Sequence, residues 1–297
     1  QTFQDFELIL LDDASTDNSL EVLDRYKDDP HVSHLVVNEQ NTGSPFKQWM
    51  KGILLAKGKW VWIAEADDLC EPTFLETCVK QVQKYPNVSV CMTASRYIDE
   101  KGNILPQEAN YWGKKKPAVS ACKFPGKTYA EHNMYWNCCV ANASGVLFRR
   151  SYATNLSDSS FLSMRYSGDW YFWFQMLLQG DMIEVYAELN KFRQHTAKVS
   201  VEGVKSGNRI KEDIDTLFLM EKTFPGMKKY KRRLAHGMIC RKIKKVNDAD
   251  KRIELSRYLS ERLGGKASDL RLFHLNNYLR FICPWLITIK RDRLKAL

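Results

Sequence analysis

The sequence predicts an α/β fold in which a mostly parallel sheet is flanked by helices and followed by a helical C-terminal extension. Three observations support this prediction. Short apolar runs alternate with amphipathic segments through residues 1–98, which implies parallel strands joined by right-handed crossovers. The chain has 297 residues, of which 44% are hydrophobic, and this is enough for a substantial core. From about Lys211 to the end, the spacing of apolar residues is helical.

The expected strands and helices of the first hundred residues follow one another in order. The first apolar run ends at Asp12 and Asp13, and Ser15, Thr16 or Asp17 can cap the helix that comes next. The expected strands occupy residues 6–11, 34–37, 59–64 and 88–98, and the expected helices occupy residues 15–29, 44–58 and 71–86.

Beyond residue 100 the alternation is less regular. Residues 101–117 are polar and rich in turn formers, and we interpret the run Lys114–Lys116 as a solvated loop. The later pattern predicts strands at 142–151 and 183–195, an aromatic-rich helix at 168–180, and amphipathic helices at 214–224, 252–263 and 270–297.

The charge is distributed unevenly along the chain. Lys and Arg total 45 against 35 acidic residues, which gives a net charge of +10, and the basic excess begins near Lys222. Such a region favours an anionic partner, and a membrane surface fits better than nucleic acid because no nucleic-acid module accompanies the charge. There is no signal peptide, no apolar run long enough to span a bilayer, and no CxxC pair among the eight Cys. These features are typical of a cytoplasmic, soluble or peripheral protein with reduced thiols.

Two acidic pairs follow predicted strands directly. Asp12 and Asp13 come after the first strand, and Asp67 and Asp68 come after the third, close to Glu65. Ligands of parallel α/β sheets gather at the carboxyl ends of strands, and a cluster of like charges is costly unless a cation or hydrogen-bond donors compensate it. Carboxylate oxygens suit Mg²⁺ or Mn²⁺. The alternative is that each pair belongs to a solvated loop or caps a helix.

Five stretches taken together resemble a known family. They are "QTFQDFELILLDDASTDNS", "NTGSPFKQWMKGILLAKGKWVWIAEADD", "NASGVLFRRS", "SGDWYFWFQMLLQG" and "LNKFRQH", in that order. This order resembles the family 2 glycosyltransferases of the GT-A fold, which transfer sugars from nucleotide-sugar donors. The version with "KQW" and "WIAEADD" is similar to bacterial enzymes of capsule, O-antigen and other surface-polysaccharide synthesis. The resemblance covers roughly residues 1–200.

The resemblance implies roles for the acidic residues. Asp13 would bind the nucleotide base with Asp12 beside it, and Asp67 would lie near the ribose and diphosphate. Asp68, with Asp67, would hold the Mg²⁺ or Mn²⁺ ion that stabilises the departing nucleoside diphosphate. Glu65 stands where many relatives carry Asp.

The resemblance also implies a catalytic base and further donor contacts. Asp169 matches the base that takes a proton from the acceptor hydroxyl, so that the sugar is transferred with inversion; the alternative is that it caps a helix beginning at Trp170. His195 is expected near the metal or diphosphate. Arg193 and Lys47 are expected near the phosphates, although an exposed helical lysine is the default for Lys47.

We expect two regions in the chain. Residues 1–205 would form the GT-A catalytic domain, with the family's first strand and helix missing before Gln1, and residues 206–297 would form a basic helical extension. The extension has two open interpretations. It lies on an anionic membrane at the inner face of the cell membrane, or it packs on the catalytic core or on a second subunit in a homo-oligomer.

The expected function is that of an inverting, metal-dependent glycosyltransferase that acts on a saccharide or lipid-linked acceptor. One alternative is a non-catalytic carbohydrate- or partner-binding module that keeps the fold. Another is a nucleotidyltransferase on a similar sheet, which would share the acidic residues but not the later motifs "SGDW" and "FRQH". The donor sugar and the base depend on pocket shape and are not predicted.

Overall fold

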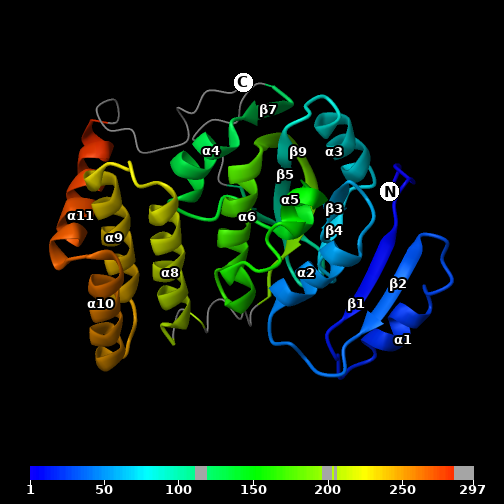
Figure 1. Ribbon diagram of the computed structural model, residues 1–297, viewed down its shortest axis with the longest axis horizontal. Coiled ribbons are helices and arrows are strands. Elements are labelled where there is room, and N and C mark those ends of the chain that lie inside the picture. Colours follow the sequence, from blue (N-terminus) through cyan, green and yellow to red (C-terminus); the bar gives the residue numbers. More distant parts are fainter. Residues whose placement is uncertain (111–118, 196–202, 204–205, 284–297) are drawn as a thin grey trace.

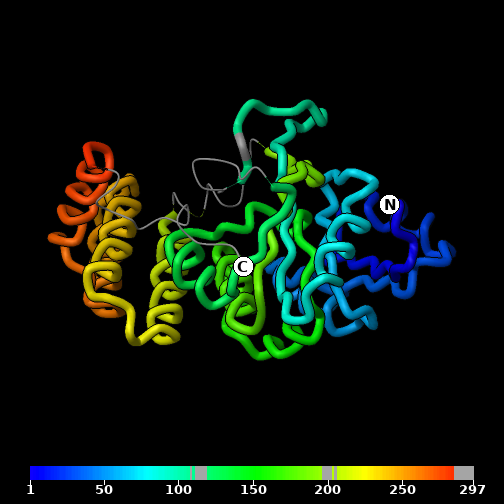
Figure 2. The backbone as a smooth tube through the Cα atoms, turned by 90° about the horizontal axis from the view of Figure 1, so that it is seen from above, coloured from blue at the N-terminus to red at the C-terminus, as the bar shows by residue number. Residues whose placement is uncertain are grey.

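The structure, a computed structural model, describes residues 1–110, 119–195, 203 and 206–283. It contains a central sheet with helices on both faces, a small N-terminal sheet on one side and a group of helices at the other end (Figure 1). The view from above places the first residues and the last described helix at opposite ends of the molecule (Figure 2). The predicted α/β class with C-terminal helices is therefore confirmed.

Two sheets are present in the described part of the chain. The strands are β1 (Leu8–Asp12), β2 (Val32–Val37), β3 (Trp60–Trp62), β4 (Leu69–Cys70), β5 (Val88–Ile98), β6 (Ile104–Glu108), β7 (Ala121–Phe124), β8 (Val146–Arg149) and β9 (Asp181–Arg193). The larger sheet has the order β3-β8-β5-β9-β4, with β6 paired to β5 and β7 paired to β9. β1 and β2 pair separately and in parallel.

The larger sheet is mixed, which corrects the expectation of a mostly parallel sheet. Only β5 and β9 pair in parallel in it, whereas β3, β4, β6, β7 and β8 all pair antiparallel with their neighbours. Apolar periodicity identifies a strand but carries no information about its direction. β8 follows two short irregular helices instead of a crossover helix, and it enters between β3 and β5 in the opposite direction to both.

The helices agree with the predicted segments; α1, α2 and α3 are shorter than predicted, whereas α8 and α10 begin earlier and are longer. The α-helices are α1 (Ser19–Asp24), α2 (Pro45–Leu55), α3 (Phe74–Val82), α4 (Gly126–Tyr129), α5 (Arg150–Thr154), α6 (Gly168–Gln179), α8 (Asn208–Thr223), α9 (Lys229–Ile243), α10 (Ala249–Leu263) and α11 (Ala267–Ile282). Three short helices of other types are η1 (Ala130–Met134), η2 (Ala143–Gly145) and η3 (Ser160–Ser163). The residue that precedes α1 is Asn18, and not Ser15, Thr16 or Asp17 as expected.

The central sheet separates two apolar cores. Along β8, Val146 and Phe148 face the helices α2 and α6, whereas Leu147 faces α3, as alternation in a strand requires. The α6 side holds most of the aromatic residues, including Trp173 and Phe172. These contacts fix both the end of β3 and the start of α6, where the candidate site residues lie.

The larger core continues into the C-terminal helices. Buried side chains of α8, α9 and α10, among them Leu217, Ile239 and Leu255, belong to the same cluster as the aromatic residues of α6. The expected boundary between residues 205 and 206 is thus not a boundary of the core. Among the described residues no helix is both long and apolar enough to cross a membrane. Lys114–Lys116 and residues 284–297 lie outside the described part of the chain.

Candidate active site

Asp12 and Asp13 lie at the end of β1, where the chain turns toward α1. The Asp13 carboxylate accepts hydrogen bonds from Asn38 Nδ2 at 2.6 Å, Gln48 Nε2 at 2.7 Å and the backbone N–H and Oγ1 of Thr42 at 3.0 and 2.8 Å. Partial burial alone would raise the pKa of Asp13. The hydrogen bonds have the larger combined effect and hold this pKa below its ordinary value. Asp12 is buried and accepts the Ser15 N–H at 3.0 Å. Asp13 is therefore a fixed, ionised carboxylate.

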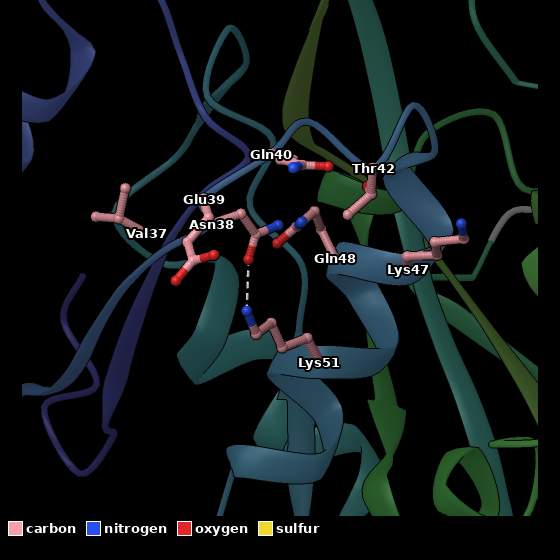
Figure 3. A pocket seen from close by; sticks show the side chains of 8 residues that line it. All are labelled: Val37, Asn38, Glu39, Gln40, Thr42, Lys47, Gln48 and Lys51. Atoms are coloured by element: carbon pink, nitrogen blue, oxygen red, sulfur yellow. Dashed lines mark hydrogen bonds between the residues drawn. The ribbon is translucent and has the colours of Figure 1, made fainter.

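A cavity of about 490 Å³ opens beside Asp13, between the end of β2 and the first turns of α2. Figure 3 shows Lys51 reaching Asn38 across it, with Nζ and Oδ1 2.5 Å apart, while the ammonium of Lys47 turns away from this pair. Gln48 also lines the cavity, and its Oε1 is buried without a hydrogen-bond partner among the described residues. A buried acceptor of this kind favours a ligand that brings an N–H group.

Asp68 is held by backbone and side chains from two distant segments. Its Oδ2 accepts hydrogen bonds from Asn142 Nδ2 at 2.5 Å and Ser144 Oγ at 2.7 Å, and its Oδ1 accepts the Arg193 N–H at 2.9 Å. Ser144 also accepts the backbone N–H of Glu65 at 3.0 Å. The turn around η2 and the end of β9 thus fix the acidic segment after β3.

Asp67 and His195 form the most open part of the site. Asp67 Oδ2 lies 2.7 Å from His195 Nε2, and the two side chains are 47% and 43% exposed. The guanidinium of Arg193 donates to the backbone carbonyls of Asp67, Asp99 and Glu100 at 2.6 to 2.9 Å. Arg193 therefore fixes the backbone around Asp67, while the side chains of Asp67 and His195 remain accessible to a ligand.

Glu65 faces the interior instead of the ligand side. Its carboxylate accepts the Trp49 Nε1–H at 3.0 Å. Burial raises the pKa of Glu65 against the effect of this hydrogen bond, and the nearby charges of Asp68 and Asp67 raise it further. Trp49 in turn packs against Trp173 of α6, with ring centroids 6.1 Å apart. Glu65 thus connects the acidic segment to the core under α6.

Asp169 lies in the first turn of α6 and is partly exposed. It accepts the Trp170 N–H at 2.7 Å. Desolvation raises the pKa of Asp169 to about 6. The hydrogen bond from Trp170 and the charge of Arg209 lower this pKa, and the charge of Asp213 raises it. The residue that precedes the helix is Ser167, so the alternative in which Asp169 caps a helix starting at Trp170 is wrong. A carboxylate with this pKa is suited to act as a general base near neutral pH.

One loop borders both acidic centres. Asn142 and Ser144 contact Asp68. A few residues earlier, burial raises the pKa of the Cys138 thiol, and the charge of Asp169 raises it further. The "NASG" motif of residues 142–145 thus has a structural role that its sequence does not indicate. The only available signal was that two polar residues precede an apolar strand, which does not reveal a contact with a segment more than 70 positions away.

Two side chains that can bind a metal ion, those of Asp67 and His195, lie together in this site. Among residues 1–110, 119–195, 203 and 206–283, no group of three or more His, Cys, Asp or Glu side chains is arranged to hold a metal ion. Asp67 and His195 meet, whereas the Asp68 carboxylate points to Asn142 and Ser144. Mg²⁺ in enzymes is commonly bound by one or two carboxylates together with substrate phosphates, so a pair of side chains is compatible with such an ion.

Comparison with solved structures gives the fold. TarS from S. aureus superposes with a TM-score of 0.51 at 14% sequence identity, covering 97% of this chain and 69% of that one. The TarS complex with UDP-GlcNAc also gives a TM-score of 0.51 at 14% identity, over 93% of this chain and 74% of that one. At this identity the likeness concerns the fold, and it supports the GT-A arrangement.

Sequence comparison gives the family. The glycosyltransferase GlyG of Streptococcus pneumoniae is 36% identical over 105 residues, which cover 35% of this chain and 34% of that protein. The chondroitin synthase of Escherichia coli is 29% identical over 112 residues, 37% of this chain and 16% of that protein. The chain thus spans about a third or less of the length of these relatives. The family model described as glycosyl transferase family 2 matches residues 1–156, more than half of the chain. The protein belongs to glycosyl transferase family 2.

Proposed function

We propose that the protein is an inverting, metal-assisted glycosyltransferase that moves a sugar from a nucleotide-sugar donor to a hydroxyl of a saccharide or lipid-linked acceptor. The observation that carries the proposal is Asp169, a partly buried carboxylate with a pKa of about 6. The loop that holds Asp68 through Asn142 also carries Cys138, whose thiol pKa the charge of Asp169 raises, and this supports a base placed near the acidic donor site. Relatives that include polysaccharide synthases support a role in bacterial surface-polysaccharide synthesis.

The cavity beside Asp13 is the proposed nucleotide site. The buried Gln48 Oε1 presents an acceptor in it, and Asp13 holds the lining residues Asn38, Thr42 and Gln48 in place. Nucleobases carry N–H donors that suit such an acceptor. Lys47 lies on its rim, where an ammonium can approach a phosphate. Because the TarS neighbour was solved with UDP-GlcNAc, a uridine diphosphate sugar is the first donor to test.

Asp67 and His195 are the proposed protein ligands of Mg²⁺ or Mn²⁺, with one carboxylate oxygen and one imidazole nitrogen. Asp68 Oδ1, which accepts one hydrogen bond from Arg193, has a lone pair left for the same ion or for a water bound to it. When bound, the ion would stabilise the negative charge that develops on the nucleoside diphosphate.

Asp169 is the proposed base. Its carboxylate takes the proton of the acceptor hydroxyl as that oxygen attacks the anomeric carbon, on the face opposite the diphosphate. The new bond joins the acceptor oxygen to the anomeric carbon, the bond from that carbon to the phosphate oxygen breaks, and the configuration inverts. A proton acceptor with a pKa near 6 is ionised at pH 7 and still basic enough to assist this transfer.

α11 is the proposed membrane-contacting element, at the inner face of the cell membrane. Leu275, Tyr278 and Ile282 follow helical spacing and are 52%, 62% and 47% exposed, and Phe281 is 87% exposed. Asp269, the acidic residue of this helix, is buried. The exposed surface of α11 is therefore apolar and basic, which favours binding to an anionic membrane leaflet. Co-sedimentation with vesicles containing phosphatidylglycerol should be lost in Phe281→Ser. Binding that persists, or self-association that replaces it, contradicts the proposal.

The test of the enzymatic proposal is turnover of nucleotide sugars by the purified protein with Mn²⁺. We expect a donor to be hydrolysed slowly without acceptor, and Asp169→Asn to bind that donor but to lose turnover. A binding module without catalysis would bind a glycan and turn over no donor in the panel. Full turnover by Asp169→Asn would refute the assignment of the base.

A further inference from the structure

Two acidic residues of α8 contact the loop that leads into Asp169. α8 lies beside α6 (Figure 1), in the part of the chain that follows the region matched by the family model. The Glu212 carboxylate accepts the backbone N–H groups of Arg165, Tyr166 and Ser167 at 2.8, 2.7 and 2.8 Å. Three consecutive N–H groups therefore converge on one side chain.

Asp213 adds a second contact to the same loop. It is 3% exposed, accepts the Ser167 hydroxyl at 2.7 Å, and is neutralised by Lys242 Nζ at 2.8 Å. Ser167 precedes α6 but its side chain does not cap the helix, because its hydroxyl is directed to Asp213 instead. Asp213 therefore holds the residue immediately before α6 from another helix.

The residue that follows this loop is closely packed. A Cβ added at Gly168 would lie 2.5 Å from the Phe46 ring and 2.8 Å from the Phe161 carbonyl oxygen. The backbone just before Asp169 is consequently held by two sets of contacts, the packing of Gly168 against Phe46 and Phe161 and the hydrogen bonds of residues 165–167 to Glu212. Asp169 is the next residue, and its position follows from that of the loop.

We propose that Glu212 and Asp213 are positioning residues for Asp169, so that the C-terminal helices take part in catalysis through the loop 165–167. The inference rests on the proposed role of Asp169 as the base. A general base must lie within hydrogen-bond reach of the proton that it removes, and a misplacement of about 1 Å can cost on the order of 100-fold in rate. The side chains of α8 are therefore part of the active-site machinery without touching the substrate.

The test compares Glu212→Ala with Asp215→Ala. Asp215 is a carboxylate on the same helix that accepts hydrogen bonds from Tyr258 and Arg262 of α10, so its loss perturbs the helices but not the loop. We expect kcat to fall about 10- to 100-fold in Glu212→Ala, with the donor KM within about twofold of wild type. In Glu212→Gln one acceptor oxygen remains, and part of kcat should return. Equal kcat in Glu212→Ala and Asp215→Ala overturns the proposal.

A second measurement separates this inference from the proposed function. The carboxyl carbon of Asp169 can be titrated by NMR in the intact protein, whether or not a donor is turned over. The charge of Asp213 raises the pKa of Asp169, so Asp213→Asn should lower the midpoint from about 6 while Asp215→Ala leaves it unchanged. An unmoved midpoint in Asp213→Asn refutes the coupling. Absence of turnover in the wild-type protein together with a lowered midpoint refutes the enzymatic proposal alone.

Discussion

Replacement of Asp169 by Asn should make the protein more stable and less active at the same time. The folded state raises the pKa of Asp169 from 3.8 to about 6, so folding favours the neutral carboxyl group. That contribution to stability is fully present below pH 3.8 and is lost as the pH rises through 6. A difference of about 2 pKa units corresponds to about 3 kcal/mol in the free energy of unfolding.

Asn has the shape of the neutral acid and can still accept the Trp170 N–H, but it does not ionise. The variant should therefore gain stability relative to wild type as the pH rises, and about 1.4 of the 3 kcal/mol should appear between pH 5 and pH 8. The turnover should fall on the order of 10²- to 10⁴-fold, the usual contribution of a general base. In the wild-type protein kcat should rise with pH through about 6, as the base becomes ionised.

Urea unfolding of both proteins at pH 5, 6, 7 and 8 measures this difference, and other titrating groups cancel in the comparison. Asp158→Asn is the matched control, because Asp158 is an exposed aspartate on the surface before α6. A difference between wild type and Asp169→Asn that stays constant from pH 5 to pH 8 would show that folding does not raise the pKa of Asp169.

Three further predictions concern the donor side of the site. Asp67→Ala and His195→Ala should each abolish the rise in melting temperature that Mn²⁺ with a nucleoside diphosphate gives the wild type, since the pair supplies the proposed ligands; a normal rise in both variants would exclude them. Gln48→Leu should weaken UDP binding about tenfold by calorimetry, because the base loses an acceptor, and unchanged affinity would place the base elsewhere. Ser144→Ala should destabilise the protein by about 1 to 3 kcal/mol in urea unfolding, because Asp68 and the Glu65 N–H both lose a partner; a change near zero would show that water replaces the hydroxyl.

The elements that sequence alone could predict are those whose signal is local. The strand ending at Asp12, the helix after Ser44 and the aromatic helix holding Asp169 each carry their pattern within a dozen residues. The direction of a strand has no local signal. The two-residue strand Leu69–Cys70 has none either, because it forms only by pairing with β9. Short strands of this kind depend on tertiary pairing.

The candidate site shows the same division. The acidic residues could be identified because carboxylates are conspicuous after apolar strands. Their partners could not, because Asn142 and Ser144 reach Asp68 over more than 70 positions, and Glu212 reaches the loop before Asp169 over more than 40. Polar residues of this kind look like ordinary loop or helix-surface residues until the fold brings them together.

The core that runs across residues 205 and 206 limits how this protein can be recombined with its relatives. The ring of Phe224, just after α8, meets Phe174 of α6 at 5.7 Å, and Lys242 of α9 lies over the Trp170 ring at 6.0 Å. A chimera joined between residues 205 and 206 would replace one residue of each of these two contacts. A functional exchange between relatives should therefore transfer the catalytic region together with the C-terminal helices. We expect the two parts to change together in evolution.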